Sequence, residues 1–235
     1  MVETATTLVL LDIDGTLVAG GPAKEAFETA MMAVYETRGA IEGFDFSGKT
    51  DPQIARELLA DAGFTDERID ASLPALWDRY LAELEARLTE EPMYLLPGVP
   101  ELLDRLQAHP DVAVALVTGN IVRGARLKLA SVGLAQTLTI GGFGSDHEDR
   151  NLLAQIAIVR AEEACGVTFA RKRTVVVGDT PRDVVCGQRA GTRTVAVATG
   201  RCDAESLRAA GADRVFQDLL DTDEVMRELV PVMRP

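Results

Sequence analysis

Short apolar runs alternate with segments of helical period along most of this chain, and this alternation restricts the folds open to it. The runs are rich in Val and Leu, as expected of strands buried on both faces of a parallel sheet. We therefore predict an α/β fold with a doubly wound, Rossmann-like parallel sheet. The predicted strands are 6–12, 112–118, 137–142, 173–179, 193–198 and 214–216, and the predicted core helices are 99–109, 121–132, 150–165, 181–190, 204–210 and 218–232.

The stretch from Leu17 to Met93 breaks this alternation. It contains no convincing strand, and it ends shortly before Pro97-Gly98, a pair typical of turns and loops. Its three helix-like segments are 22–37, 52–61 and 66–90. We therefore predict a separate all-helical domain, residues 17–93, inserted into a core domain made of residues 1–16 and 94–235.

Composition excludes several kinds of partner. The formal net charge is −13, whereas a protein that binds nucleic acid over an extended surface needs a basic patch. No apolar run is long enough to span a bilayer, and no signal-peptide pattern precedes the first strand, so we expect a cytoplasmic protein without a membrane partner. Cys165, Cys186 and Cys202 lack the spacing of disulfide frameworks or zinc sites and are expected to be free thiols.

Two aspartates, Asp12 and Asp14, end the first apolar run and lead into Gly15-Thr16. Ligands of parallel sheets bind at the carboxyl ends of strands, and residues two apart in an extended chain point to the same side. Two such carboxylates repel unless a cation lies between them or one holds a proton. Mg²⁺ is the simplest such cation because it prefers oxygen ligands. The alternative is an ordinary turn or helix cap, since Asp-Gly is a common turn pair.

Two later strand ends carry related chemistry. Thr118-Gly119-Asn120 offers a hydroxyl and backbone amides to a phosphoryl oxygen, although capping by Asn120 alone is the simpler explanation there. Asp179 ends another apolar run, and Asp183 follows about one helical turn later. The two aspartates suit a metal ion and its bound water, or Asp179 caps the next helix. Capping does not explain why such residues recur at successive strand ends, so we predict one shared site.

These segments resemble motifs I, II and IV of the haloacid dehalogenase-like (HAD) hydrolase superfamily, in the family's order. They are Asp12–Thr16, Val117–Asn120 and Gly178–Asp183. The resemblance covers essentially the whole chain, and the helical insert lies where the family has its C1 cap domain. Within the family, the chain looks most like phosphoglycolate phosphatase-type enzymes.

The resemblance implies a role for each residue. Asp12 would be the nucleophile that forms an aspartyl phosphate, and Asp14 would be the general acid and base. Asp12 and Asp179 would ligate Mg²⁺, with help from the backbone carbonyl of Asp14 and, through water, from Asp183. Thr118 would position the phosphoryl group. The other residues expected to bind phosphate are Gly15, Thr16, Gly119 and Asn120.

Motif III departs from the family pattern. The family usually has a lysine, often in a Lys-Pro context, where this chain reads Ser145–Asn151. Arg150 is the predicted substitute because it keeps the positive charge and can hold a phosphate with two nitrogens. Lys128 is the alternative. It would need a long reach across the site, so we expect it to be a solvated helix residue.

The segment Phe46–Asp51 is the predicted substrate-facing loop of the helical domain, which would close over the site and exclude water. Lys49 would bind a carboxylate or hydroxyl of the substrate, with Thr50 beside it. An ordinary helix start, capped by Thr50 or Asp51, explains the same residues equally well. Trp77 and Tyr80 have helical spacing among leucines and are expected in the core of this domain.

We therefore predict a Mg²⁺-dependent phosphatase, a monomer or homodimer, that hydrolyses a small phosphorylated metabolite such as a phosphoglycolate-like acid or a sugar phosphate. A phosphomutase uses the same half-reactions and stays the close alternative. A dehalogenase is disfavoured because such relatives lack the second aspartate of motif I, here Asp14. A phosphoaspartate receiver module is an alternative from another class, since it also combines clustered acids, a hydroxyl residue and a basic residue on a parallel sheet. The order of Asp12–Thr16 and the large insert count against it. A catalytically silent binding protein stays open because Arg150 departs from motif III.

Overall fold

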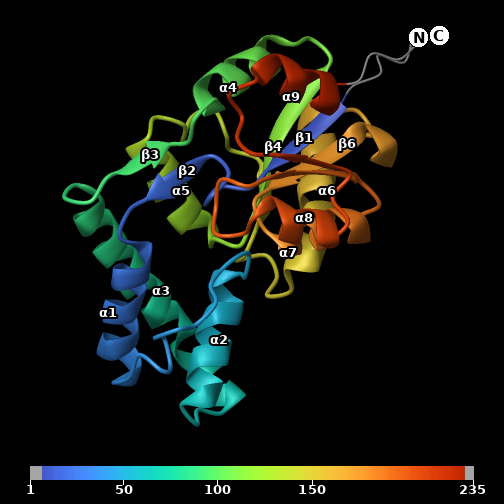
Figure 1. Cartoon of the computed structure of the whole chain (residues 1–235). Coiled ribbons are helices and arrows are strands. Elements are labelled where there is room, and N and C mark those ends of the chain that lie inside the picture. Colours follow the sequence, from blue (N-terminus) through green and yellow to red (C-terminus); the bar gives the residue numbers. More distant parts are fainter. Residues whose placement is uncertain (1–6, 231–235) are drawn as a thin grey trace.

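A six-stranded sheet forms the centre of the larger part of the molecule (Figure 1). The computed structural model describes residues 7–230, so the predicted strand start at residue 6 and helix end at residue 232 lie outside the described residues. The strand order is β5-β4-β1-β6-β7-β8, and each neighbouring pair is parallel. The first described strand, β1, lies in mid-sheet and the later strands lie on both sides of it, which confirms the doubly wound α/β fold. The strands are β1 (Thr7–Leu11), β4 (Val112–Thr118), β5 (Gly141–Phe143), β6 (Thr174–Gly178), β7 (Arg193–Val197) and β8 (Arg214–Phe216).

Helices cover both faces of this sheet because its strands are apolar on both sides. Val9 and Leu11 of β1 share a core with the helices of one face, and Leu8 and Leu10 share a core with those of the other. Helices α4 (Val99–Ala108), α5 (Val122–Ser131) and α9 (Thr222–Leu229) belong to the first face. Helices α6 (Leu153–Cys165), α7 (Pro181–Arg189) and α8 (Ala204–Ala209) belong to the second. No helix within residues 7–230 is long and apolar enough to cross a membrane.

The predicted strand 137–142 is wrong in extent, because β5 comprises only Gly141–Phe143. The backbone amides of Thr137 and Leu138 each donate to the Leu134 carbonyl oxygen at 3.1 Å, which makes this segment a turn. Its threonine and leucine residues favour a strand locally, but the chain reaches the edge of β4 only at Ile140, whose carbonyl accepts from Leu116 at 2.9 Å.

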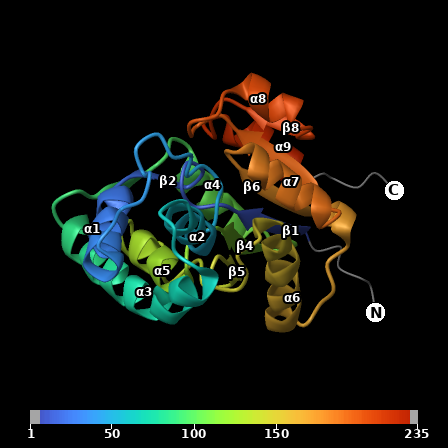
Figure 2. The same cartoon turned by 90° about the horizontal axis from the view of Figure 1, so that it is seen from below.

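Three helices, α1 (Ala23–Tyr35), α2 (Asp51–Asp61) and α3 (Asp66–Leu88), form a unit beside the sheet, which we call the helical unit. Figure 2 shows this unit gathered on one side of the molecule, with α6 to α9 on the other. Tyr80 is 2% exposed and packs edge-on against Phe27, with ring centroids 5.6 Å apart. Trp77 is partly buried on the same ring, as predicted.

A two-stranded antiparallel sheet lies where the chain passes between the sheet and the helical unit. It consists of β2 (Val18–Gly20) and β3 (Met93–Leu95), with Val18 opposite Leu95. The expectation that residues 17–93 contain no strand is therefore wrong. Each strand has three residues, too few to show an alternating pattern, and the pairing joins segments far apart in the sequence.

We predict that Gly98→Ala lowers the free energy of unfolding more than Gly133→Ala does. Both glycines have left-handed φ angles, +82° and +80°, so each alanine costs about 1–2 kcal/mol from its backbone alone. A Cβ at residue 98 would lie 2.1 Å from the Leu219 carbonyl oxygen, whereas at residue 133 it would meet nothing within 4 Å. Overpacking should therefore add about 1–3 kcal/mol to the Gly98→Ala loss. Urea unfolding measures both losses, and equal values would contradict a rigid approach of Gly98 to Leu219.

Candidate active site

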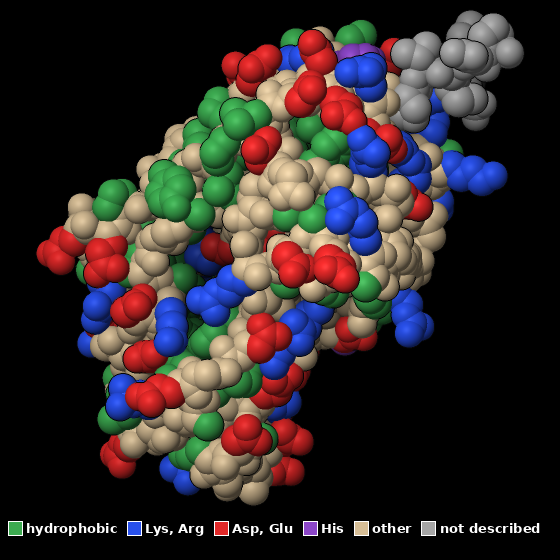
Figure 3. Space-filling view, viewed as in Figure 1, with side chains coloured by type: hydrophobic (Ala, Val, Ile, Leu, Met, Phe, Trp, Pro, Cys, Tyr) green, Lys and Arg blue, Asp and Glu red, His purple; other side chains and the backbone are tan. Residues whose placement is uncertain are grey.

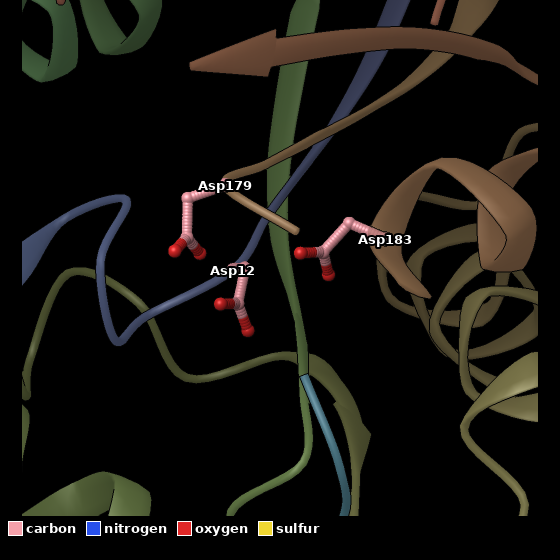
Figure 4. A group of neighbouring side chains, drawn as sticks. All are labelled: Asp12, Asp179 and Asp183. Carbon is pink, nitrogen blue, oxygen red and sulfur yellow. The ribbon is translucent and has the colours of Figure 1, made fainter. Parts of the chain in front are cut away.

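Three buried carboxylates converge at the C-terminal edge of the sheet (Figure 4). Asp12 follows β1, Asp179 follows β6, and Asp183 lies in the first turn of α7. One oxygen of each lies within 4.8 Å of those of the others, and each residue is 4% exposed or less. Because β1 and β6 are neighbours in register, their ends bring Asp12 and Asp179 side by side. The structure thus brings these three predicted residues together.

Thr180, not Asp179, caps the start of α7. The Thr180 hydroxyl accepts from the Asp183 amide, and the Asp183 carboxylate accepts from the Thr180 amide at 3.0 Å, which forms a capping box. The capping explanation for Asp179 is therefore wrong, since Thr180 is the residue whose side chain caps α7. Asp183 both caps the helix and faces the cluster.

Motif I packs directly against Asp179. Gly15 has a φ of +82°, and a Cβ there would lie 2.3 Å from Asp179 Oδ2. Only glycine combines this backbone angle with so close an approach. The Thr16 hydroxyl is fully buried and lies 3.5 Å from Asp179 Oδ1. Both predicted residues therefore lie at the acidic cluster, and Thr16 contacts a carboxylate.

Burial and the charges of neighbouring carboxylates raise the pKa values of Asp12 and Asp179. Removal from water raises the pKa of Asp12 to about 7, with a further increase from Asp183 and partial relief from Arg150. Removal from water, together with the charges of Asp183 and Asp12, raises the pKa of Asp179 to about 8. The cluster therefore has more negative charge than its neighbours balance, which favours protons or a bound cation.

Arg150 enters this cluster as predicted. It begins a 3₁₀ turn, Arg150–Leu152, after Asp149, whose side chain caps the turn. Its Nη2 donates to Asp12 Oδ1 at 2.9 Å and to Asp183 Oδ1. Only 5% of the side chain is exposed. Burial lowers the pKa of Arg150, but the charges of Asp183 and Asp12 outweigh this and raise it, so the guanidinium stays charged.

Lys128 also reaches the site, and the expectation that it is solvated is wrong. It is 4% exposed, and its ammonium lies 2.7 and 2.8 Å from the two carboxylate oxygens of Asp14. Helix α5 packs against α3 and turns a face containing Ala125, Lys128 and Leu129 inward, and the long aliphatic stem of lysine spans the remaining distance. The position of Lys128 on the apolar face of this helix was the sequence signal for its burial.

Asp14 lies apart from the three-carboxylate cluster. Its side chain is 45% exposed, and one oxygen also accepts from Asn120 Nδ2 at 2.7 Å. Burial acts to raise the pKa of Asp14, but the charge and hydrogen bonds of Lys128 lower it below the ordinary value. The two aspartates of motif I therefore do not share one cation through their side chains. Each has its own, Arg150 for Asp12 and Lys128 for Asp14.

The segment after β4 has the predicted polar groups but a different helix cap. Residue Ile121, not Asn120, occupies the N-cap position of α5. The Asn120 side chain instead donates to Asp14 and, at 2.8 Å, to the Thr118 hydroxyl. Capping by Asn120 is therefore not its role. Thr118 is 1% exposed and, with Gly119 and Asn120, lies at the wall of a cavity.

This cavity, of about 360 Å³, lies between the sheet and the helical unit. Figure 3 shows the hollow between them, with acidic and basic side chains beside it. The sheet side contributes Asp12, Asp14, Thr118, Lys128, Arg150 and Asp179. The other side contributes the apolar groups of Phe27, Phe46, Ile54 and Tyr80 together with the charged residues Lys24, Lys49 and Asp51. The volume is that of a small-molecule site.

The two predicted binding residues of the loop before α2 have different positions. Lys49 lines the cavity, where its ammonium pairs with Glu57 and lies 4.1 Å from the Phe44 ring centre. Thr50 is fully buried, accepts from the Gln53 amide as the cap of α2, and donates to the Glu148 carbonyl oxygen at 2.7 Å. The helix-start explanation therefore holds for Thr50, whose hydroxyl is already engaged.

Other residues of the cavity wall were not predicted as site residues. Asp51 accepts from the Ile121 amide at 2.8 Å, and its removal from water raises its pKa to about 6 against the effect of Lys128. Tyr80 was expected only in the core, yet it also lines the cavity. Lys24 and Arg201 are further lining residues. Arg201 follows the end of β7. Its position could have identified it as a candidate, because ligands bind at the carboxyl ends of parallel strands.

Comparisons with known proteins agree with this geometry. A family model described as HAD-hydrolase-like matches residues 153–222. The plasmid phosphoglycolate phosphatase of Cupriavidus necator is 28% identical over 93% of this chain and 92% of its own length. That of Synechococcus elongatus is 24% identical over 94% and 98%, respectively. The crystal structure of a hydrolase from Pseudomonas syringae covers 95% of this chain and 99% of its own, at 22% identity and a TM-score of 0.68. Over residues 153–222 the chain is therefore similar to haloacid dehalogenase-like hydrolases, and over most of its length it is similar to phosphoglycolate phosphatases.

Proposed function

We propose that this enzyme is a Mg²⁺-dependent phosphatase that hydrolyses small phosphate monoesters through an aspartyl phosphate on Asp12. The observation that carries the proposal is the meeting, in one cavity, of a nucleophile-type carboxylate, a second carboxylate with its own cation, and a buried arginine. Phosphoryl transfer requires mainly positioning and charge stabilisation, and these groups can supply both. The names of the relatives support the same reaction class.

The donor set fits Mg²⁺. Asp12, Asp179 and Asp183 offer only oxygen atoms, which hard divalent cations prefer, and their repulsion favours a bound cation. Asp12 and Asp179 would hold the ion, with Asp183 and the Asp14 backbone carbonyl in support. When bound, Mg²⁺ would neutralise negative charge on the transferring phosphoryl group.

In the first step, the Asp12 carboxylate attacks phosphorus and the bond from phosphorus to the alcohol oxygen breaks. Asp14 donates a proton to the departing alcohol. The bound phosphate dianion places negative charge beside Asp14 and raises its pKa, which favours the protonated form at this stage. Arg150 and Thr118 would hold the non-reacting phosphoryl oxygens, with the amides of Gly119 and Asn120.

In the second step, a water molecule attacks the aspartyl phosphate and Asp14 accepts its proton. Inorganic phosphate leaves and the Asp12 carboxylate is restored. Lys128 favours the deprotonated form of Asp14, as this step requires of a base. Asp14 therefore alternates between two protonation states, and Lys128 biases it toward one of them.

We propose that residues 17–93 act as a cap domain of the C1 type. The side of the cavity formed by this part of the chain includes Phe27, Ile54 and Tyr80, and these apolar groups would help to exclude water from the phosphoryl group. Lys49 would bind a carboxylate or hydroxyl of the substrate, as in a phosphoglycolate-like acid or a sugar phosphate. The enzyme would act in the cytoplasm as a monomer or homodimer, without a nucleic-acid or membrane partner, as its net charge of −13 favours.

The main test is release of inorganic phosphate from phosphoglycolate and a panel of sugar phosphates, with Mg²⁺ and with a chelator. We predict that Asp12→Asn lowers kcat at least about 10³-fold because it removes the nucleophile. Asp104→Asn, at an exposed position of α4, is the control and should keep full activity. A fully active Asp12→Asn variant would contradict the mechanism, and isomerised sugar phosphate in place of free phosphate would indicate a mutase.

We predict that Lys128→Met raises the pKa of Asp14 because burial is then no longer opposed by a neighbouring ammonium. Titration of the Asp14 carboxyl carbon by NMR measures this pKa directly. Lys24→Met is the control, since Lys24 also lines the cavity but its ion pair is with Glu28, at 3.8 Å. An unchanged Asp14 titration in Lys128→Met would show that the ion pair does not govern Asp14.

We predict that Mg²⁺ raises the Tm more at about pH 8.5 than at about pH 6. Asp12 and Asp179 have folded pKa values of about 7 and about 8 against an ordinary 3.8. Their protonation therefore stabilises the metal-free fold fully below about pH 4, and this stabilisation is lost as the pH rises through 7 to 8. Mg²⁺ replaces the lost protons. Thermal unfolding with Mg²⁺ and with chelator at both pH values tests this, and an equal Tm increase at both would contradict it.

A further inference from the structure

We propose that Arg56 and Glu148 are positioning residues that make the placement of Arg150 depend on closure of the helical unit over the cavity. The inference rests on the proposed role of Arg150 in holding the phosphoryl group. Arg56 belongs to α2, and Glu148 lies two residues before Arg150. The pair therefore connects the helical unit to the segment that carries the buried arginine.

The helical unit holds both the side chain and the backbone of Glu148. Arg56 Nε lies 2.8 Å from Glu148 Oε2 and 3.1 Å from Oε1. The hydroxyl of Thr50, at the start of the same helix, donates to the Glu148 carbonyl oxygen at 2.7 Å. Contacts at both ends of one residue restrict its movement more than a side-chain ion pair alone would.

Arg56 is itself fixed in direction. Its Nη1 pairs with Asp66 at 2.9 Å and its Nη2 with Asp70 at 2.7 Å, both at the start of α3. All three nitrogens of the guanidinium thus have carboxylate partners, and 28% of the side chain is exposed. Isolated surface ion pairs contribute little, but a planar guanidinium with several carboxylates is held in one orientation.

The core anchors the segment around Glu148 on either side of it. Before it, Asp146 accepts from two nitrogens of Arg160, at 2.6 and 2.8 Å. After it, the Cys186 thiol donates to the Arg150 carbonyl oxygen at 3.1 Å, and a thiol is a weak donor. Within residues 7–230, the hydrogen bonds that tie Glu148 to another element come from Arg56 of α2 and from Thr50, the N-cap of that helix. The approach of the chain to Arg150 therefore depends on the helical unit.

Small displacements of Arg150 matter because its guanidinium pairs with Asp12, the proposed nucleophile. Its Nη2 bonds Asp12 and Asp183, and its Nε, within the described chain, is buried without a hydrogen-bond partner. A misplacement of about 1 Å in such a group can lower the rate about 100-fold. Opening of the helical unit would release Glu148 and loosen this placement, so efficient phosphoryl transfer would be confined to the closed cavity.

The test compares Arg56→Gln, Glu148→Gln and the double variant with Arg123→Gln. Arg123 is the matched control because it also joins the sheet part to the helical unit, through Asp78 at 2.9 Å, and is not part of the Glu148 segment. Four quantities are measured: kcat, KM, the affinity for inorganic phosphate with Mg²⁺ present, and the Tm. Glu148→Gln leaves the Arg56 pairs inside the helical unit intact, so agreement between the two single variants isolates the link.

We expect each single variant to lower kcat and phosphate affinity about tenfold, and the double variant to lower them no further, since both changes break one link. Arg123→Gln should stay within about twofold of the parent protein and show a similar Tm change. Losses equal to those of Arg123→Gln, or additive losses, would overturn the inference while leaving the phosphatase proposal intact. If the parent protein hydrolyses no ester, the phosphate-affinity measurement decides, and a parent protein that does not bind phosphate would overturn both.

Discussion

Repulsion between carboxylates at the ends of parallel strands is the constraint on which the site depends. Asp12, Asp179 and Asp183 are buried within 4.8 Å of one another, and buried charges are strongly destabilising unless they are paired. Arg150 supplies part of the balance, and the raised pKa values of Asp12 and Asp179 show that the balance is incomplete. The site is therefore built to take up positive charge, from protons or from a metal ion.

The two aspartates of motif I differ in acidity although they are only two residues apart. Arg150 stands beside Asp12, where burial and neighbouring acids dominate and the pKa is about 7. Lys128 pairs with Asp14, whose side chain is more exposed, and there the ammonium charge outweighs burial and lowers the pKa. Such opposed environments separate two chemically identical groups into different roles, here proposed as nucleophile and as acid and base.

The parts of this structure that depend on local pattern could be predicted from the sequence. Apolar runs show where each strand of a parallel sheet ends. Because the carboxyl ends of such strands lie at one edge of the sheet, the residues that follow them could be predicted to form one site. Lys128 is buried, contrary to the expectation of a solvated residue, because it lies on the inward face of α5 and its long side chain reaches Asp14. The pairing of β2 with β3 and the contacts of Glu148 with α2 join distant segments. Residues so far apart have no shared local pattern, so a periodicity argument does not detect them.

The β2–β3 pair also bears on how the chain folds. Strands β1 and β4 are parallel neighbours in the sheet, although the whole helical unit lies between them in the sequence. Once Val18 pairs with Leu95, the path from β1 to β4 is roughly fourfold shorter, which lowers the loop-closure entropy cost by about 1 kcal/mol. If this small sheet forms first, the entropy cost of closing the inserted domain falls on that step, and the later pairing of β1 with β4 depends little on the length of the insertion.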